Sequence, residues 1–422
     1  MRIETKCVQA GYQPENGQPR ILPIYQSTTY KYDSAEHLGK LFDLTVPGHM
    51  YTRISNPTVE MVEEKIAALE GGVGAMLTSS GQAANLLAVL NIASAGDNIV
   101  CSSAIYGGTI NLFAFTLKRL GIETRFFTPE ATDAEISALI DGRTRLVFGE
   151  TVANPALIVC DIERLAHIAH AHDVPLVIDN TFPTPVLCRP IEFGCDIVTH
   201  STTKYMDGHA SVVGGCIVDS GKFDWEKAGK YPELTEPDES YHGVVYTKSF
   251  GRAAYINKAR AQLMRDFGCT PQPIAAFILN LGLESLAVRM ERHCENAQAV
   301  AEYLEKHPKV SWVNYPGLAS SPQHDLAQKY LPRGVCGVVS FGVKGGREAA
   351  MRFMDSLRLA QIVVHVADAR TSVLHPASTT HRQLTDEQLV DAGISADLVR
   401  LSVGIENIED ILEDLEQAFN KI

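Results

Sequence analysis

The sequence is poor in the features that mark several common protein classes. Its 422 residues include nine cysteines without any Cys-x-x-Cys spacing, and this odd, scattered set indicates reduced thiols rather than a disulfide framework. No apolar run reaches the about 18 residues that a membrane span needs. Residues 1–6 lack the apolar core of a signal peptide. These absences predict a cytoplasmic protein that has no membrane partner.

Charge and glycine patterns exclude further classes. The formal net charge is −13 and no basic stripe occurs, so nucleic acid is not an expected partner. No Gly-Lys-Ser or Gly-Lys-Thr phosphate loop occurs, and Leu77 stands where a dinucleotide motif starting at Gly72 needs its third glycine. His167, His170 and His172 lie on a predicted helix without a neighbouring carboxylate or cysteine to complete a ligand set, so we expect no metal.

Two apolar runs end in side chains of complementary chemistry. Residues 176–178 end on Asp179, and residues 197–198 run into hydroxyl residues that end on Lys204. The lysine offers an amine for a Schiff base, and the aspartate offers a carboxylate that can hold a pyridine nitrogen protonated. Pyridoxal phosphate needs both groups from its protein, together with a cradle for its phosphate.

Residues 78–84 offer such a cradle ahead of a helix-like stretch at residues 85–93. Gly81 allows close backbone approach, and Ser79 and Ser80 add hydroxyl donors. The N-terminus of a helix presents free N–H groups and a positive dipole end, and both suit a phosphate.

A second candidate phosphate contact lies upstream. Asn56 and Pro57 predict the start of a helix, which leaves Tyr51 and Arg53 in the preceding loop. An arginine beside a tyrosine suits a phosphate clamp, because the guanidinium fork matches phosphate oxygens. A surface arginine next to a packed tyrosine is the alternative interpretation.

The middle of the chain alternates short apolar runs with helical stretches. This alternation predicts an α/β fold with a mostly parallel sheet, whose ligands lie beyond the carboxyl ends of the strands, where Asp179 and Lys204 fall. We expect an extended arm over residues 1–58, an α/β domain over 59–275 and a smaller α/β domain over 276–422. The predicted strands are residues 98–101, 124–127, 146–148, 176–178 and 197–198.

Several segments together resemble the Cys/Met-metabolism family of pyridoxal-phosphate enzymes, in the right order and over nearly the whole chain. The resemblance implies the fold type I of pyridoxal-phosphate-dependent transferases (aspartate aminotransferase-like), with a large, mostly parallel sheet domain and a smaller C-terminal domain. The segments are Tyr51-Thr52-Arg53-Ile54-Ser55-Asn56-Pro57-Thr58, Ser79-Ser80-Gly81, Tyr106-Gly107-Gly108-Thr109, Asp179-Asn180-Thr181-Phe182, Ser201-Thr202-Thr203-Lys204-Tyr205 and Arg400-Leu401-Ser402-Val403-Gly404-Ile405-Glu406.

The resemblance implies a role for each matched position. Lys204 would form the Schiff base, Asp179 would face the pyridine nitrogen, and Tyr106 would stack on the ring and assist catalysis. Arg400 would bind the substrate α-carboxylate, with Ser372 as a second substrate-binding residue. The remaining implied cofactor contacts are Asn154 beside the ring hydroxyl and the phosphate contacts Ser80, Gly81, Gln82, Ser201 and Thr203.

Tyr51 and Arg53 resemble a pair that reaches the phosphate in a neighbouring subunit, and Tyr51 is also a candidate for shaping the γ-site. The resemblance therefore implies a homo-oligomer, a tetramer built from dimers that share active sites. The other partners that it implies are a small amino-acid substrate and sulfide.

Within the family, residues 375–384 resemble most closely the sulfhydrylases that use O-acetylhomoserine. Gln82 stands where many cystathionine synthases and lyases have methionine, and Gly108 stands where methionine γ-lyases commonly have cysteine. This resemblance implies a transferase of methionine biosynthesis that converts O-acetylhomoserine and sulfide, or methanethiol, to homocysteine, or methionine, and acetate.

Three alternatives stay open on the sequence. The enzyme would instead eliminate the γ-substituent of methionine or cystathionine, or it would use O-succinylhomoserine as the sulfhydrylase substrate. The third alternative is a non-catalytic α/β protein that binds a phosphorylated ligand, and the presence of both Lys204 and Asp179 argues against it.

Overall fold

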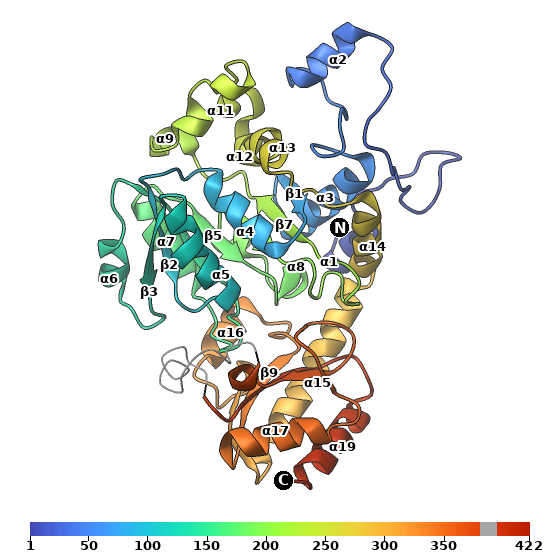
Figure 1. The fold of residues 1–422 in the computed structure, drawn as a ribbon, viewed down its shortest axis with the longest axis vertical. Helices are drawn as coiled ribbons and strands as arrows, with labels where there is room; N and C mark the ends of the chain where they lie inside the picture. The colour runs from blue at the N-terminus through green and yellow to red at the C-terminus, as the bar shows by residue number, and fades with distance from the viewer. Residues whose placement is uncertain (380–394) are drawn as a thin grey trace.

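Two β-sheets organise the chain, and a computed structural model describes residues 1–379 and 395–422 of it (Figure 1). The larger sheet has the strand order β1-β7-β6-β5-β4-β2-β3, and the smaller sheet has the order β10-β11-β12-β9-β8. The chain passes from the first to the second through α14 (Pro273–Glu284) and the long helix α15 (Leu286–Lys306).

In the larger sheet, β6, β5, β4, β2 and β3 run parallel, whereas β7 is antiparallel to both of its neighbours. The carboxyl ends of β4, β5 and β6 therefore meet at one edge. The sequence pattern does not predict β1 or β7, because their apolar runs are too short to distinguish from turns of a buried helix. The strands are β1 (Gly74–Thr78), β2 (Asn98–Ser102), β3 (Glu123–Phe127), β4 (Thr144–Glu150), β5 (Leu176–Asp179), β6 (Ile197–His200) and β7 (Gly215–Asp219).

Local signals explain where the helices of this domain begin and end. The Asn56 side chain accepts a hydrogen bond from the Thr58 amide at 2.9 Å, Pro57 takes the first helical position, and Gly71 ends α3 with a left-handed φ of 83°. The longer helices and those near the site are α3 (Pro57–Glu70), α4 (Gly81–Leu90), α5 (Gly107–Asn111), η1 (Leu112–Leu117), α6 (Asp133–Ala138), α7 (Ile162–Ala171), α8 (Thr184–Leu187) and η2 (Pro190–Phe193).

Short helical turns then cover the outer end of the sheet. They bury aromatic residues, such as Trp225 stacked on Tyr255 with 5.5 Å between ring centroids. These turns are α9 (Trp225–Ala228), α10 (Pro232–Thr235), η3 (Glu239–Tyr241), α11 (Tyr246–Phe250), η4 (Gly251–Ala253), α12 (Ala254–Lys258), η5 (Ala259–Met264) and α13 (Arg265–Phe267).

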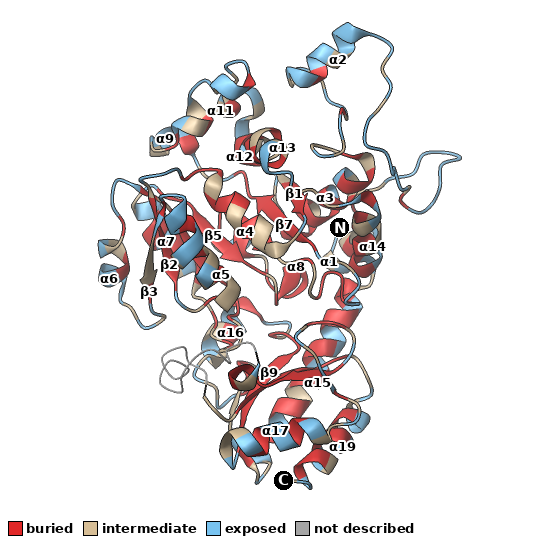
Figure 2. Cartoon of the chain, viewed as in Figure 1, coloured by how far each residue is buried: buried red, intermediate tan, exposed pale blue. Residues whose placement is uncertain are grey.

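The N-terminal segment contains two short helices that its weak periodicity does not predict. Helix α1 (Ile3–Gln9) packs against α3, α14 and α15, and Cys7 is its buried residue. Helix α2 (Ala35–Phe42) stands away from the sheets, and Figure 2 shows it largely exposed. Seven or eight residues offer too few turns for a helical pattern to stand out from the surrounding loop.

The smaller sheet is covered by α15, α17 and α19. Helix α19 is rich in acidic residues, of which Asp414 is buried and accepts the amides of residues 358–360 at 2.8–3.0 Å. The elements are β8 (Val310–Asn314), α16 (His324–Tyr330), β9 (Val338–Val343), α17 (Gly346–Ser356), β10 (Gln361–Ile362), β11 (Ser372–Leu374), η6 (Pro376–Ser378), β12 (Leu398–Ser402) and α19 (Ile408–Phe419).

Among the described residues, no single helix is long and apolar enough to cross a membrane. Helices α14 and α15 pass that test only as a pair, and the pair is bent by 59°.

Arg289 on α15 ties the second domain to the segment that follows β6. Its buried guanidinium donates to the carbonyls of Tyr205 at 2.8 Å and Gly282 at 2.7 Å, and burial lowers the pKa of Arg289 to about 10. Replacement of this side chain would remove the guanidinium donor from both carbonyls, and among the described residues only the Gly282 carbonyl would keep another side-chain donor, the Ser285 hydroxyl at 3.3 Å.

We expect Arg289→Met to lower the free energy of unfolding by about 3 kcal/mol, because it removes the charge-assisted hydrogen bonds to the carbonyls of Tyr205 and Gly282. Chemical denaturation would measure the change. Arg292→Met on the same helix is the matched control, since Arg292 pairs with Glu295 at the surface and its loss should cost less than about 0.5 kcal/mol. Equal losses of unfolding free energy in Arg289→Met and Arg292→Met would contradict the role of Arg289 in joining the second domain to the segment after β6.

Candidate active site

The edge where β4, β5 and β6 end carries a fixed carboxylate. Asp179 is buried, and its Oδ1 accepts the Thr181 amide at 3.1 Å and the Thr181 hydroxyl at 2.5 Å, while Asn85 of α4 donates to Oδ2 at 3.3 Å. Burial raises the pKa of Asp179, and the bonds from Thr181 and Asn85 oppose that shift. A carboxylate held this way is ready to pair with a cationic ring nitrogen.

Thr181 also fixes the neighbouring strand end. Its hydroxyl oxygen accepts the amide of Ser201 at 2.8 Å while its proton goes to Asp179. This hydroxyl therefore fixes the position of the Asp179 carboxylate relative to the start of the turn at residues 201–204. The sequence analysis did not single out Thr181, because an unremarkable threonine two residues after an aspartate carries no distinct signal.

Lys204 lies partly buried in that turn. Burial lowers the pKa of Lys204 to about 8, the positive charge of Arg400 adds to the effect, and Asp368 opposes it. A larger fraction of this amine is therefore neutral near physiological pH than in an exposed lysine, and the neutral amine is the form that attacks an aldehyde.

Helix α4 begins four residues earlier than the predicted helical stretch, at the proposed phosphate cradle. The Ser80 hydroxyl caps it by accepting the Ala83 amide at 3.1 Å, and the Ser80 carbonyl accepts the Ala84 amide. No hydrogen bond among the described residues engages the amides of Gly81 and Gln82. These two amides point from a helix N-terminus and suit an anion.

The cradle requires a glycine at position 81. A Cβ on Gly81 would lie 2.6 Å from the Cβ of Ser201, so only glycine allows α4 to start against the turn that carries Lys204. Thr203, predicted as a phosphate contact, has its hydroxyl between the amide and the carbonyl of Gly214 at 3.0 and 3.1 Å.

Tyr106 is anchored by a carboxyl that the sequence analysis missed. Its amide donates to Glu150 Oε2 at 2.6 Å, and Glu150 ends β4 in register with Asp179 on β5. Burial and the charge of Asp179 raise the pKa of Glu150 well above its usual value. The Tyr106 ring is 47% exposed, and a Cβ on Gly108 would approach it to 2.5 Å. Glu150 lies at the end of β4, and this position after an apolar run was the sequence signal that could have identified it.

Arg400 reaches this edge from the second domain. It is buried on β12, and it donates to Asn154 Oδ1 at 3.2 Å and to the Val364 carbonyl at 3.3 Å. Burial lowers the pKa of Arg400 to about 10, so the guanidinium stays charged at neutral pH. Ser372 is buried on the adjacent strand, and the register places it on the same sheet face as Arg400.

Tyr51 and Arg53 are not brought to this edge by their own chain. Both are exposed, and the guanidinium carbon of Arg53 lies 5.4 Å from the centre of the Tyr51 ring. No interaction among the described residues joins either side chain to Lys204, Asp179 or the start of α4. Their predicted role in a neighbouring subunit remains a prediction.

Two further expectations concern residues away from the edge. His170 is paired with Asp196 at 2.7 Å, and the described residues contain no group of three or more side chains suited to a metal ion. His375 is buried and its Nε2 bonds the Ala396 carbonyl at 2.9 Å, whereas residues 380–384 of the subgroup segment lie outside the described residues.

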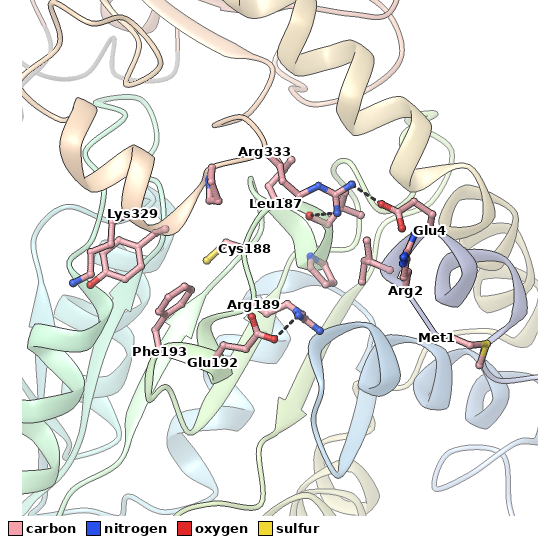
Figure 3. Close-up of a pocket in the computed structure, with 15 residues that line it drawn as sticks. Met1, Arg2, Glu4, Leu187, Cys188, Arg189, Glu192, Phe193, Lys329 and Arg333 are labelled. Carbon is pink, nitrogen blue, oxygen red and sulfur yellow. Dashed lines mark hydrogen bonds and ion pairs between the residues drawn. The ribbon is translucent and has the colours of Figure 1, made fainter.

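A surface cavity of about 430 Å³ lies elsewhere, between the N-terminus, the segment 185–193 and the segment 329–333 (Figure 3). None of the residues described above lines it. Two of the arginines that line it are engaged in ion pairs, Arg333 with Glu4 at 2.6 Å and Arg189 with Glu192. The chemistry of the chain therefore centres on the strand edge and not on this cavity.

Comparison with known proteins decides which cofactor this edge serves. Residues 4–420 match the family described as "Cys/Met metabolism PLP-dependent enzyme". The chain belongs to this family. The strand-edge residues fit pyridoxal phosphate, because a partly neutral lysine, a buried carboxylate and two amides without assigned partners at a helix start match its aldehyde, ring nitrogen and phosphate.

The similarity extends over full lengths. The chain is 50% identical to a homocysteine synthase of Schizosaccharomyces pombe, covering 99% of this chain and 97% of that one. It is 48% identical to an O-acetyl-L-homoserine sulfhydrylase of Thermus thermophilus, covering 99% and 100%. A solved structure from Campylobacter jejuni, described as an O-acetylhomoserine (thiol)-lyase with a pyridoxyl-lysine, superposes with a TM-score of 0.95 at 36% identity over 100% of both chains.

These comparisons confirm the predicted family, the predicted fold type I and the predicted cofactor. The roles of individual residues stay predictions, which rest on the geometry above.

We expect Thr181→Val to weaken the binding of pyridoxal phosphate about tenfold, since it removes one hydroxyl that serves both Asp179 and the Ser201 amide. Titration of the apo-protein with the cofactor, followed by absorbance, would measure this. Thr181→Ser keeps the hydroxyl and should bind nearly as the parent does. If valine and serine behaved alike, the hydroxyl would have no such role.

Proposed function

We propose that this chain is an O-acetylhomoserine sulfhydrylase. It replaces the acetyl ester at Cγ with sulfide and gives homocysteine and acetate, and methanethiol in place of sulfide gives methionine. The observation that carries the proposal is the 44–50% identity, over nearly full lengths, to proteins named homocysteine synthase or sulfhydrylase. The amine, carboxylate and guanidinium at the strand edge supply the groups that this reaction needs.

Bound pyridoxal phosphate supplies a conjugated ring that accepts electrons from the substrate's Cα. Asp179 would hold the ring nitrogen of the cofactor through its carboxylate. Lys204 would hold the cofactor's aldehyde, and its amine would also move protons at Cα and Cβ of the amino acid. Tyr106, held by Glu150, lies over the same edge and assists the transfer of the incoming amine proton.

Arg400 binds the substrate α-carboxylate and thereby fixes which bond at Cα is presented to Lys204. The balance of the reaction is simple. The Cγ–O bond breaks with its electron pair going to acetate, and hydrosulfide forms the new Cγ–S bond. Loss of the γ-group requires that a proton first leave Cβ, and Lys204 is the base in reach of it.

Tyr51 and Arg53 support an oligomeric enzyme in this proposal. A guanidinium and a phenol on an exposed arm are suited to the phosphate bound by another subunit. We infer a tetramer that is built from two dimers, each with shared active sites. All nine cysteines are unpaired, which supports a reducing compartment such as the cytoplasm.

Steady-state kinetics test the proposed function. O-acetylhomoserine, O-succinylhomoserine and methionine would each be supplied with and without sulfide, and homocysteine and 2-oxobutyrate would be measured. We expect sulfide-dependent homocysteine formation from the acetyl ester to be the fastest reaction. Faster sulfide-independent formation of 2-oxobutyrate from methionine would identify a γ-lyase instead.

Subunit mixing tests the shared site. Arg53→Ala and Lys204→Ala chains should each be inactive. An equal mixture that exchanges subunits at random should recover up to about a quarter of the parent activity, because about half of its dimers are mixed and one of the two sites in each mixed dimer has both residues intact. A mixture of Arg53→Ala with the double variant Arg53→Ala/Lys204→Ala is the matched control and should stay inactive. Activity in a verified monomer would reject the shared site.

A further inference from the structure

The ends of β5 and β6 also meet on the face of the sheet opposite the Asp179 side chain. The register places Asp179 beside Thr199. Successive side chains of a strand alternate between the two faces, so those of the next residues, Asn180 and His200, both point to the opposite face. Helix α4 lies on the Asp179 face, since its Asn85 bonds that carboxylate.

Glu70, the last residue of α3, binds both of these side chains with one carboxylate oxygen. His200 Nε2 donates to Oε1 of Glu70 at 2.7 Å, and Asn180 Nδ2 donates to the same oxygen at 3.0 Å. All three side chains are buried. This strand-end link of Glu70, Asn180 and His200 therefore holds the residue after Asp179 against the residue before the turn at 201–204.

Asn180 extends the strand-end link to its surroundings. Its Oδ1 accepts the hydroxyl of Thr151, which follows β4, at 2.9 Å, and its Nδ2 also donates to the carbonyl of Cys188 at 2.9 Å. Its backbone amide donates to the Thr199 carbonyl at 2.9 Å. The ends of β4, β5 and β6 are thus one hydrogen-bonded unit beneath the edge that carries Asp179.

The strand-end link lowers stability in one respect. Oε2 of Glu70 and Nδ1 of His200 are buried and have no hydrogen bond among the described residues. Buried polar atoms without partners are destabilising, and well-packed apolar side chains in the same space would avoid that cost. Stability alone therefore does not account for an acid at this position, whereas directional hydrogen bonds that fix two strand ends do.

The spacing of these strand ends matters because the cofactor is rigid. The ring nitrogen and the aldehyde carbon of pyridoxal phosphate lie on opposite sides of one aromatic ring. Their proposed partners come from different strands, with Asp179 at the end of β5 and Lys204 after β6. A misplacement of about 1 Å between reacting groups can cost about a hundredfold in rate.

We propose that Glu70 is a positioning residue for the cofactor, which sets the spacing between the Asp179 carboxylate and the Lys204 amine. This role rests on the proposed function, which gives Asp179 and Lys204 their parts in cofactor binding. Glu70 acts from beneath the sheet, through the ends of β5 and β6. Thr181 joins the same two strand ends on the Asp179 face, so they are fixed from both sides.

Titration of the apo-protein with pyridoxal phosphate, followed by absorbance, tests this role. We expect Glu70→Leu to raise the dissociation constant about tenfold, because the strand ends lose their common acceptor. Glu70→Gln keeps an acceptor oxygen at the same place and should bind nearly as the parent does. The rate at which the cofactor's aldehyde links to Lys204, measured by borohydride trapping, should fall in Glu70→Leu and not in Glu70→Gln.

Asp196→Val is the matched control. Asp196 is also buried, pairs with His170 at 2.7 Å and accepts the Leu176 amide at 2.8 Å, so it joins β5 to β6 at their opposite ends. Its replacement should lower the free energy of unfolding, as Glu70→Leu does, and leave the dissociation constant of the cofactor unchanged. Equal cofactor affinities in Glu70→Leu and Asp196→Val would overturn the role of Glu70.

A second variant decides the matter if Glu70→Leu does not fold. His200→Leu removes the bond to β6 and leaves the bond between Glu70 and Asn180 in place. It should also weaken cofactor binding, and unchanged binding in this variant would overturn the proposal. A parent enzyme that forms no homocysteine from O-acetylhomoserine and sulfide overturns the proposed function instead, whereas the cofactor titration still decides the role of Glu70.

Discussion

The contact between Arg400 and Asn154 is the constraint on which the site depends. It joins β12 of the second sheet to the loop after β4 of the first, across 246 positions of sequence. Ser340 donates to the Pro155 carbonyl at 2.9 Å and Asn314 donates to the Ala156 carbonyl, so the same loop is held by three strands of the second domain. Lys204 follows a strand of the larger sheet and Arg400 lies on a strand of the smaller one, so the proposed binding of an amino acid by both residues depends on this docking.

That docking collects charges that the chain does not neutralise by itself. Burial pulls the pKa of Lys204 down to about 8 and that of Arg400 to about 10, while it pushes the pKa of Asp179 and Glu150 upward. Each shift records the cost of a charge without a full partner. In the proposed function, a phosphate, a pyridine nitrogen and a substrate carboxylate would supply counter-charges, so cofactor and substrate binding should stabilise the folded chain. Without cofactor and substrate, these buried charges lower the stability of the folded chain, and binding of both would raise it.

Sequence reasoning singled out Asp179 and Lys204 at the ends of apolar runs, and Gly81 in the segment ahead of a predicted helix. The structure brings these three positions to one edge of the sheet, whereas their roles stay predictions. Sequence reasoning missed Glu150, because the hydrogen bond that this carboxyl accepts from the Tyr106 amide joins residues 44 positions apart. It placed the start of α4 too late, since the capping bond from Ser80 to the Ala83 amide carries no apolar periodicity. Long-range packing decides where a helix starts and which distant side chains meet, and a local sequence pattern carries no information about that packing.

The N-terminal arm shows another limit of sequence reasoning. Tyr51 and Arg53 are recognisable in its sequence, but no interaction among the described residues joins either side chain to the strand edge. Large apolar side chains there are exposed to a degree that a single chain does not explain, with Tyr25 at 49%, Ile21 at 49% and Phe42 at 50%. Ordering such a segment costs conformational entropy that its own few contacts do not offset. A second subunit that covers this apolar surface and accepts Arg53 and Tyr51 at its site would offset both costs with one interface. The site would then depend on contacts between two chains as well as on contacts between two domains.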